Sequence, residues 1–167
     1  MTKKLNETHA AYYSSPESHS EKMNAYIHFF VAAEEGDIES MIQLSTSDIT
    51  WDFDAGSEIV NGIPWIGLFK GHQAIREVSQ KIKKFRIEVL TREYYLISET
   101  ESQLIIFAKD TVRLFGSIVV PNISFANAIT FQGGKISYIK TVEDNARLLK
   151  AYELYQAEQA VKAWSEG

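Results

Sequence analysis

Two adjacent carboxylic acids, Glu143 and Asp144, stand at the end of a segment in which apolar and polar residues alternate. A carboxylate that faces an apolar pocket can abstract an acidic C–H proton if its pKa is raised toward neutrality. Alternation through Ile139 and Thr141 places Glu143 on the inner face of a strand. Asp144 stands where a following helix needs a cap, so two roles are open for it, a catalytic base and a helix cap.

Other kinds of reactive site find no support in the residues. The chain contains no cysteine, which excludes disulfides, thiol nucleophiles and thiolate metal sites. Its four histidines are scattered without metal-binding spacing. No phosphate-binding loop, dinucleotide-binding glycine pattern or nucleophilic serine elbow is present. We therefore expect neither a metal site nor a cofactor.

The amino-acid composition limits the kinds of molecule that the protein is expected to bind. Hydrophobic residues make up 45% and aromatic residues 12% of the 167 residues, enough for a packed interior but with little room for a second core. A net charge of -5 argues against a nucleic-acid or anionic-membrane surface. No apolar stretch is long enough to cross a bilayer, and no secretory signal is visible. These features predict a soluble, cytoplasmic protein.

Helical spacing dominates both ends of the chain. The polar residues 1–18 are expected to form an N-terminal arm, and residues 19–167 one domain. Ser18 and Ser20 are rival N-caps of a first helix that ends at Gly36. Further helices are predicted at about 38–42, 72–84 and 144–165.

Strand spacing dominates the middle of the chain. Alternation predicts strands at about 48–54, 85–97, 102–115, 118–132 and 135–143. Gly133 and Gly134 tolerate positive φ and predict a hairpin turn, whereas residues 55–71 are rich in glycine and predict a loop. Helices followed by a meander of long strands indicate an α+β fold. A strongly bent sheet has a concave face that is either filled by side chains or left as a pocket.

Four segments carry a resemblance to a known family: Phe30–Asp37, Asp48–Phe53, Pro64–Gly71 and Gly134–Asp144. In order and spacing they resemble the SnoaL-like and ketosteroid isomerase-like branch of the nuclear transport factor 2-like superfamily. The resemblance implies a cone-shaped roll, in which a curved antiparallel sheet wraps around the N-terminal helices and leaves an apolar pocket. Such proteins include isomerases, cyclases, dehydratases, epoxide hydrolases and non-catalytic domains, and many form homodimers through the convex sheet face.

Particular site residues follow from the resemblance. The tyrosine, the base and the second hydrogen-bond donor of ketosteroid isomerases correspond to Phe30, Phe53 and Asn127. Phenyl rings transfer no protons, so that mechanism is not expected, but Asn127 keeps a donor amide. Polyketide cyclases of this family use a base at the position of Asp144. Tyr26 lies one helical turn before Phe30, so its hydroxyl is expected either to reach the cavity or to bond to backbone within the core.

The expected pocket wall is mainly aromatic. We predict that it is formed by Phe30, Trp51, Phe53, Trp65, Phe69, Phe125, Ile129, Ile139 and Thr141. If these side chains line a cavity rather than fill it, the ligand is flat or hydrophobic, because few polar groups are available to hold it.

The sequence thus favours a small-molecule pocket protein that binds an apolar or aromatic carbonyl compound. If it is an enzyme, it is expected to be a cofactor-free isomerase, cyclase or dehydratase, with Asp144 or Glu143 as base and Asn127 and Tyr26 as hydrogen-bond partners. The alternative is a non-catalytic ligand-binding or dimerisation module of the same fold. An epoxide hydrolase needs an arginine between two aspartates, and the segment from Lys109 to Arg113 offers these residue types in a register that does not fit. A homodimer is expected.

Overall fold

The structure is a computed structural model that describes residues 20–53, 63 and 65–165 of the 167-residue chain. Its elements are α2 (Glu21–Glu35), α3 (Ile38–Gln43), β1 (Ser45–Phe53), β2 (Gly67–Lys70), α4 (Gly71–Lys84), β3 (Glu88–Glu99), β4 (Gln103–Leu114), β5 (Ile118–Gln132), β6 (Lys135–Glu143) and α5 (Asn145–Ser165). The predicted α+β class is confirmed. The predicted N-terminal arm, 1–18, lies outside the described residues.

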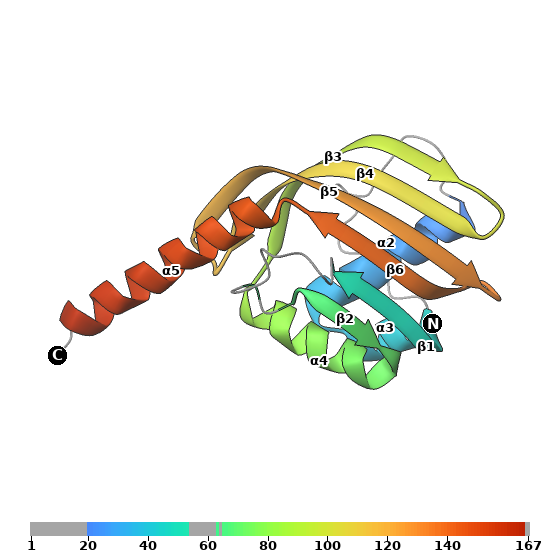
Figure 1. Cartoon of the computed structure of the whole chain (residues 1–167), viewed down its shortest axis with the longest axis horizontal. Helices are drawn as coiled ribbons and strands as arrows, with labels where there is room; N and C mark the ends of the chain where they lie inside the picture. The colour runs from blue at the N-terminus through green and yellow to red at the C-terminus, as the bar shows by residue number, and fades with distance from the viewer. Residues whose placement is uncertain (1–19, 54–62, 64, 166–167) are drawn as a thin grey trace.

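The strands form one curved sheet that covers α2 on its concave side (Figure 1). Their order is β2-β1-β6-β5-β4-β3, and only the pair β1 and β6 is parallel among the described strands. The strand pairing shifts register twice between β3 and β4, and once each in β4–β5 and β5–β6. Such bulges bend strands, which gives the sheet the curvature that a concave pocket requires.

Capping side chains and a glycine set the ends of helices α2 and α3. The side chain of Ser20 accepts a hydrogen bond from the Met23 amide, so Ser20 is the N-cap of α2. Gly36 ends this helix in the left-handed conformation with φ of 72°, which glycine adopts without steric cost. Asp37 then caps α3 through the Ser40 amide. The rival cap Ser18 lies outside the described residues.

The core lies between the concave face and the helices. Along β4, Leu104, Ile106, Ala108, Val112 and Leu114 are buried on this face, and the residues between them are more exposed. Buried residues of α2, α4 and α5 complete the same hydrophobic cluster. Asp110 occupies one position in this inward row, so a charge sits among apolar side chains.

One predicted loop is partly wrong. Residues 55–71 were expected to lack regular structure, but Gly67–Lys70 forms β2, an edge strand antiparallel to β1. A strand of four residues is too short for alternation to reveal it, and pairing with β1 stabilises it. The predicted Gly133–Gly134 turn is confirmed, since both residues have positive φ between β5 and β6.

The C-terminal helix α5 packs only through its first half. Leu148 and Ala151 are buried, whereas Val161 and Trp164 are 69% and 91% exposed. The second half extends away from the sheet (Figure 1). Across the described segments, none of the helices is both long and apolar enough to cross a membrane.

Candidate functional site

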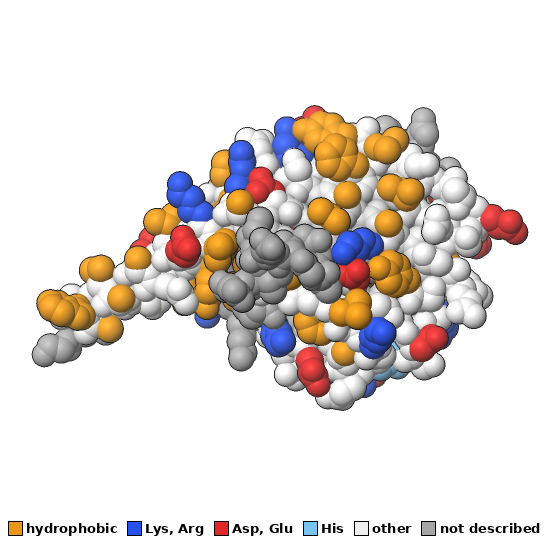
Figure 2. All heavy atoms as spheres, in the orientation of Figure 1, with side chains coloured by type: hydrophobic (Ala, Val, Ile, Leu, Met, Phe, Trp, Pro, Cys, Tyr) orange, Lys and Arg blue, Asp and Glu red, His pale blue; other side chains and the backbone are white. Residues whose placement is uncertain are grey.

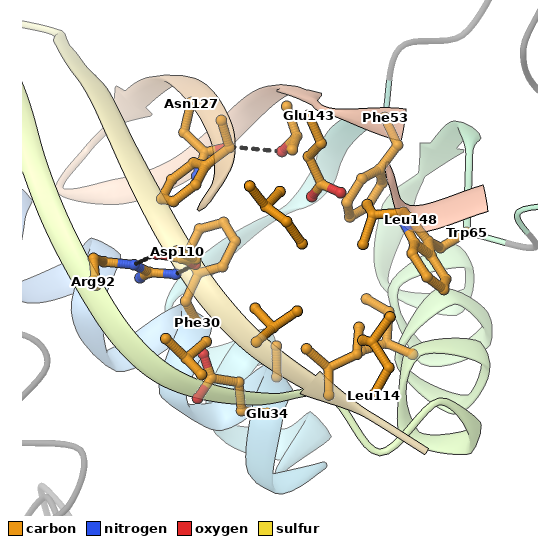
Figure 3. Close-up of a pocket in the computed structure, with 18 of the residues that line it drawn as sticks. Phe30, Glu34, Phe53, Trp65, Arg92, Asp110, Leu114, Asn127, Glu143 and Leu148 are labelled. Carbon is orange, nitrogen blue, oxygen red and sulfur yellow. Dashed lines mark hydrogen bonds and ion pairs between the residues drawn. The ribbon is translucent and has the colours of Figure 1, made fainter. Parts of the chain in front are cut away.

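A pocket of about 120 Å³ opens on the concave side of the sheet (Figure 3). Every layer of the fold contributes to its wall: α2, the strands β1 and β3 to β6, α4 and the start of α5. Of the predicted site residues, those that line it are Phe30, Trp51, Phe53, Trp65, Phe125, Asn127, Thr141 and Glu143.

The remaining predicted residues lie elsewhere. Ile129 and Ile139 are buried in the core and do not line the pocket. Phe69 on β2 packs edge-on against Phe53, with 6.2 Å between ring centroids, and does not reach the wall itself. Tyr26 is fully buried behind the wall.

Asp144 lies at the start of α5, outside the pocket wall. Its Oδ1 accepts a hydrogen bond of 3.3 Å from the Arg147 amide, and its Oδ2 lies 3.1 Å from Arg147 Nε. These contacts are those of a helix cap, because they satisfy an amide that has no partner within the first turn. Of the two adjacent carboxyls, only Glu143 faces the cavity.

Glu143 points into the pocket from the end of β6, beside Phe53 (Figure 3). Burial raises the pKa of its carboxyl to about 7, and the negative charge of Asp110 adds to this effect. A hydrogen bond from Trp65 and the positive charge of Arg92 act in the opposite direction. Glu143 is therefore divided between acid and carboxylate near neutral pH.

A buried ion pair forms another part of the wall. Arg92 on β3 donates two hydrogen bonds to Asp110 on β4, with Nε–Oδ1 and Nη2–Oδ2 distances of 2.8 and 2.6 Å. The two side chains are only 6% and 8% exposed. The guanidinium also lies over the Phe125 ring, 4.8 Å from its centroid. The pair brings a positive and a negative group to the pocket with no net charge.

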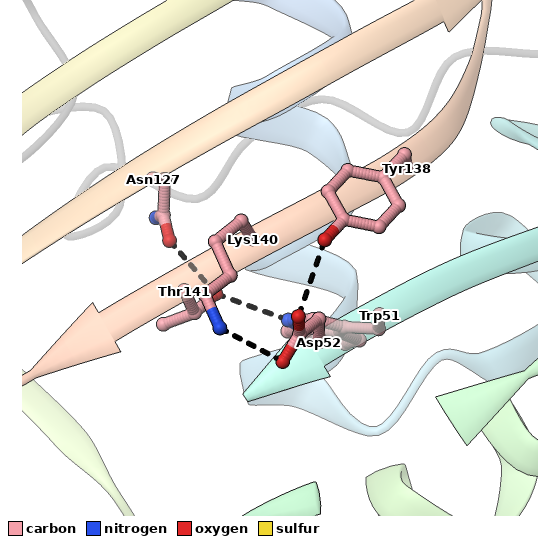
Figure 4. Close-up of polar contacts among 6 residues, drawn as sticks. All are labelled: Trp51, Asp52, Asn127, Tyr138, Lys140 and Thr141. Carbon is pink, nitrogen blue, oxygen red and sulfur yellow. Dashed lines mark hydrogen bonds and ion pairs between the residues drawn. The ribbon is translucent and has the colours of Figure 1, made fainter. Parts of the chain in front are cut away.

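A chain of hydrogen bonds fixes the orientation of Asn127 (Figure 4). The indole N–H of Trp51 donates to Thr141 Oγ1 at 3.1 Å, and Thr141 donates to Asn127 Oδ1 at 2.8 Å. An indole nitrogen can only donate, so the Thr141 proton is directed to Asn127. The Asn127 amide then donates to Tyr26 Oη at 3.3 Å. Burial raises the pKa of Tyr26, which keeps its hydroxyl protonated.

Arg92 and Glu34 line the pocket but were not among the predicted site residues. The arginine beside Asp110 is Arg92, whereas Arg113 forms an exposed ion pair with Glu88. Alternation along β4 places Asp110 in the inward row and could have identified it. Two register shifts in the β3–β4 pairing interrupt the alternation around Arg92. The sequence pattern therefore does not predict that the Arg92 side chain points inward.

No group of three or more side chains able to hold a metal ion occurs within residues 20–53, 63 and 65–165. In sequence, the chain matches no protein-family model and no curated protein. An NTF2-like protein from Burkholderia xenovorans LB400 is 22% identical with a TM-score of 0.63, and the alignment covers 81% of this chain and 98% of the other.

The chain has the nuclear transport factor 2-like fold. Two further structures of this fold have ligands or activities in their names. TerC, co-crystallised with polyporic acid, is 16% identical with a TM-score of 0.65, covering 80% of this chain and 99% of the other. An LEH-like epoxide hydrolase from M. tuberculosis is 12% identical with a TM-score of 0.59. The alignment covers 85% of this chain and 96% of the other. At these identities the likeness establishes the NTF2-like fold and leaves the chemistry to the site.

Proposed function

We propose that this chain is a cofactor-independent enzyme that binds a small apolar carbonyl compound and moves a proton on it. The observation that carries the proposal is Glu143, whose pKa of about 7 arises within a mainly apolar pocket wall. A group with this pKa exists as base and as acid in comparable amounts near neutral pH. A residue that takes a proton and later returns it needs this property.

The proposed reaction uses two polar groups of the pocket, the Glu143 carboxyl and the Asn127 amide. The Glu143 carboxylate takes a proton from a carbon next to the carbonyl, and the electron pair of the broken C–H bond moves onto the carbonyl oxygen. The second amide hydrogen of Asn127 stabilises this oxygen, because Trp51 and Thr141 hold the amide in one orientation. In a substrate with a carbon–carbon double bond beyond that carbon, Glu143, now a neutral acid, returns the proton to the far end of the double bond, and the double bond moves into conjugation with the re-formed carbonyl. The net result is an isomerisation.

Hydrogen exchange tests proton removal before the natural substrate is identified. The protein is incubated in D₂O with 2-cyclohexenone and acetophenone, and C–H to C–D exchange is followed by NMR. We expect exchange above the rate in buffer, rising through about pH 7 as Glu143 ionises. Glu143→Gln is expected to reduce the exchange at least about a hundredfold, since a general base contributes that much or more.

Asp144, the carboxyl next to Glu143, provides the control for the Glu143→Gln variant. Asp144→Asn removes an acid outside the pocket, so exchange per folded molecule is expected to persist. Exchange at the buffer rate with wild-type protein, together with binding of the ketones, would contradict the proposal. That result would favour a non-catalytic ligand-binding module of the same fold.

Epoxide hydrolysis is a second reaction that the Arg92–Asp110 pair brings into consideration. In that reaction Glu143 would deprotonate a water molecule, and an acid would protonate the oxygen that leaves carbon. Both oxygens of Asp110 accept hydrogen bonds from Arg92, so an Asp110 that donates a proton would have to give up part of this pairing. The proposed carbonyl chemistry needs no second acid, and we therefore prefer it.

The convex face of the sheet supports the proposal of a homodimer. Leu96, Phe107, Ala126 and Val142 pair in register across β3 to β6, and the three large side chains are 53%, 41% and 43% exposed. Figure 2 shows hydrophobic side chains gathered over the sheet. A broad apolar surface of this kind indicates a protein interface. We propose that a second copy of the chain covers it.

A charged substitution on this face tests the homodimer. Wild-type protein is expected to sediment with the mass of two chains at micromolar concentration. Phe107→Lys is expected to give the mass of one chain, since the new charge would be buried in the interface. Val161→Lys, an exposed apolar position on α5, is the matched control and should leave the mass unchanged. A monomeric wild-type protein would contradict the proposal.

The cellular location proposed from the sequence is the cytoplasm. The lack of cysteine suits a reducing compartment, where disulfides are not needed for stability. Fractionation of the host cell is the direct test, and recovery with periplasmic or secreted proteins would contradict it.

A further inference from the structure

The size of the pocket limits what can enter it. Its volume is about 120 Å³. For comparison, an engineered apolar cavity of about 150 Å³ in another protein holds a benzene molecule. Trp65, Leu114 and Leu148 lie across the hollow from Arg92 and Asp110 and limit its depth (Figure 3). There is room for one ring with small substituents, and additional fused rings would have to stand outside the pocket or displace the side chains that line it.

The charges of the pocket limit the ligand further. Arg92 is the only cation among the described lining residues, and both of its hydrogen bonds to Asp110 are already formed. Two further carboxyls, Glu34 and Glu143, belong to the same wall. A ligand carboxylate would lose its water in a wall where three carboxyls already stand against one guanidinium, so it would add like charge to a desolvated site. A neutral ligand meets no such penalty.

The polar groups of the pocket lie on one side of it and would orient a bound ligand. Asn127, Thr141 and Glu143 come from neighbouring positions of β5 and β6, where Asn127 pairs with Thr141 and Phe125 pairs with Glu143. The wall formed by Ile82, Leu114 and Leu148 is apolar. A ring that enters with its carbonyl oxygen toward Asn127 therefore has its adjacent carbon near Glu143 and its hydrocarbon edge on these three side chains.

We propose that the substrate is a neutral monocyclic ketone, held with its oxygen at Asn127 and its ring against Ile82, Leu114 and Leu148. The proposal rests on the proposed function for the reaction and adds the size and the charge of the substrate. It excludes polycyclic ketones such as steroids, and it excludes ring carboxylates.

Binding affinities test size and charge separately. Dissociation constants are measured at pH 8 by quenching of tryptophan fluorescence, because Trp51 and Trp65 line the pocket. The ligands are acetophenone, its charged isostere benzoate, the two-ring ketone 1-tetralone and the four-ring ketone androstenedione. Acetophenone is expected to bind at least about tenfold more tightly than each of the others, a ratio typical of misfits in an apolar site. Equal or tighter binding of benzoate or androstenedione would overturn the proposal.

Variants of the wall show whether its volume sets the preference. Leu148→Ala enlarges the pocket, and 1-tetralone is expected to bind about tenfold more tightly to it than to wild-type protein. Ile82→Ala serves the same purpose if the first variant does not fold. Leu104→Ala is the matched control, since Leu104 is fully buried but does not line the pocket. Ala33→Met fills the cavity and is expected to abolish acetophenone binding. Unchanged preferences in all pocket variants would overturn the proposal.

The two proposals fail in different ways. If acetophenone binds in the expected order but shows no hydrogen exchange, the size and charge assignment stands and the acid–base enzyme does not. If exchange occurs but androstenedione is bound and exchanged as well as acetophenone, the enzyme stands and the monocyclic substrate does not. Failure of all four ligands to bind overturns both.

Discussion

Glu143→Gln is expected to stabilise the protein at pH 8 by on the order of 3 kcal/mol, and to leave its stability at pH 4 close to that of wild type. The pKa of Glu143 is about 7 in the folded chain, against an ordinary value of 4.5. A difference of about 2.5 pH units corresponds to about 3 kcal/mol, because each unit is worth about 1.4 kcal/mol. Glutamine carries no charge, and its side-chain oxygen can still accept the hydrogen bond from Trp65.

The sign follows from proton binding. Between pH 4.5 and 7 the folded protein holds a proton on Glu143 that the unfolded chain has released, so stability falls as the pH rises. Below pH 4.5 both states are protonated and the destabilisation is absent. Above pH 7 both are ionised, and the full cost of desolvating the Glu143 carboxylate in the pocket is present.

Thermal unfolding from pH 4 to pH 8 measures this difference. For a domain of this size, about 3 kcal/mol corresponds to a rise in Tm of on the order of 8 °C at pH 8. Glu153→Gln, an exposed position on α5, is the matched control and is expected to track wild type at every pH. A Glu143→Gln variant that also tracks wild type would show that the carboxyl titrates as it does in water.

The second large effect is expected at the Arg92–Asp110 pair. Asp110→Asn leaves a guanidinium in an apolar wall and is expected to destabilise the fold by about 3–5 kcal/mol, and Arg92→Met is expected to cost a similar amount. Arg92→Met combined with Asp110→Leu removes both charges, so its cost is expected to fall well below the sum of the single changes. Urea unfolding of all variants gives the coupling energy.

An exposed pair on the same two strands provides the control for this cycle. Arg113 and Glu88 form an ion pair whose side chains are 37% and 55% exposed. Solvent screens such a pair, so its coupling is expected to lie below about 1 kcal/mol. If the costs at Arg92 and Asp110 are additive, the pair is not desolvated as its contacts indicate.

Much of the fold was readable from the sequence, because long strands repeat the same pattern. In β4, β5 and β6, alternation gave spans that agree with the structure to within one residue. The same alternation directed Glu143 inward, whereas spacing left two roles open for Asp144, a catalytic base and a helix cap. These inferences involve neighbours along the chain, for which spacing is sufficient information.

Contacts between distant segments were not readable. The Arg92–Asp110 pair depends on the register of β3 against β4, which shifts on either side of Arg92. The edge strand β2 depends on pairing with β1 rather than on its own four residues. The direction of the hydrogen bonds from Trp51 to Tyr26 depends on four elements meeting behind the pocket, and no local pattern contains it.

The central claim is that the pocket holds Glu143 between its acid and carboxylate forms near neutral pH. Carbon-13 NMR of protein labelled at the glutamate side-chain carboxyls measures this directly, and loss of one signal in Glu143→Gln assigns the resonance. We expect that signal to titrate with a midpoint near pH 7. A midpoint near 4.5 would contradict both the desolvation of the Glu143 carboxyl within the pocket and its role as the base.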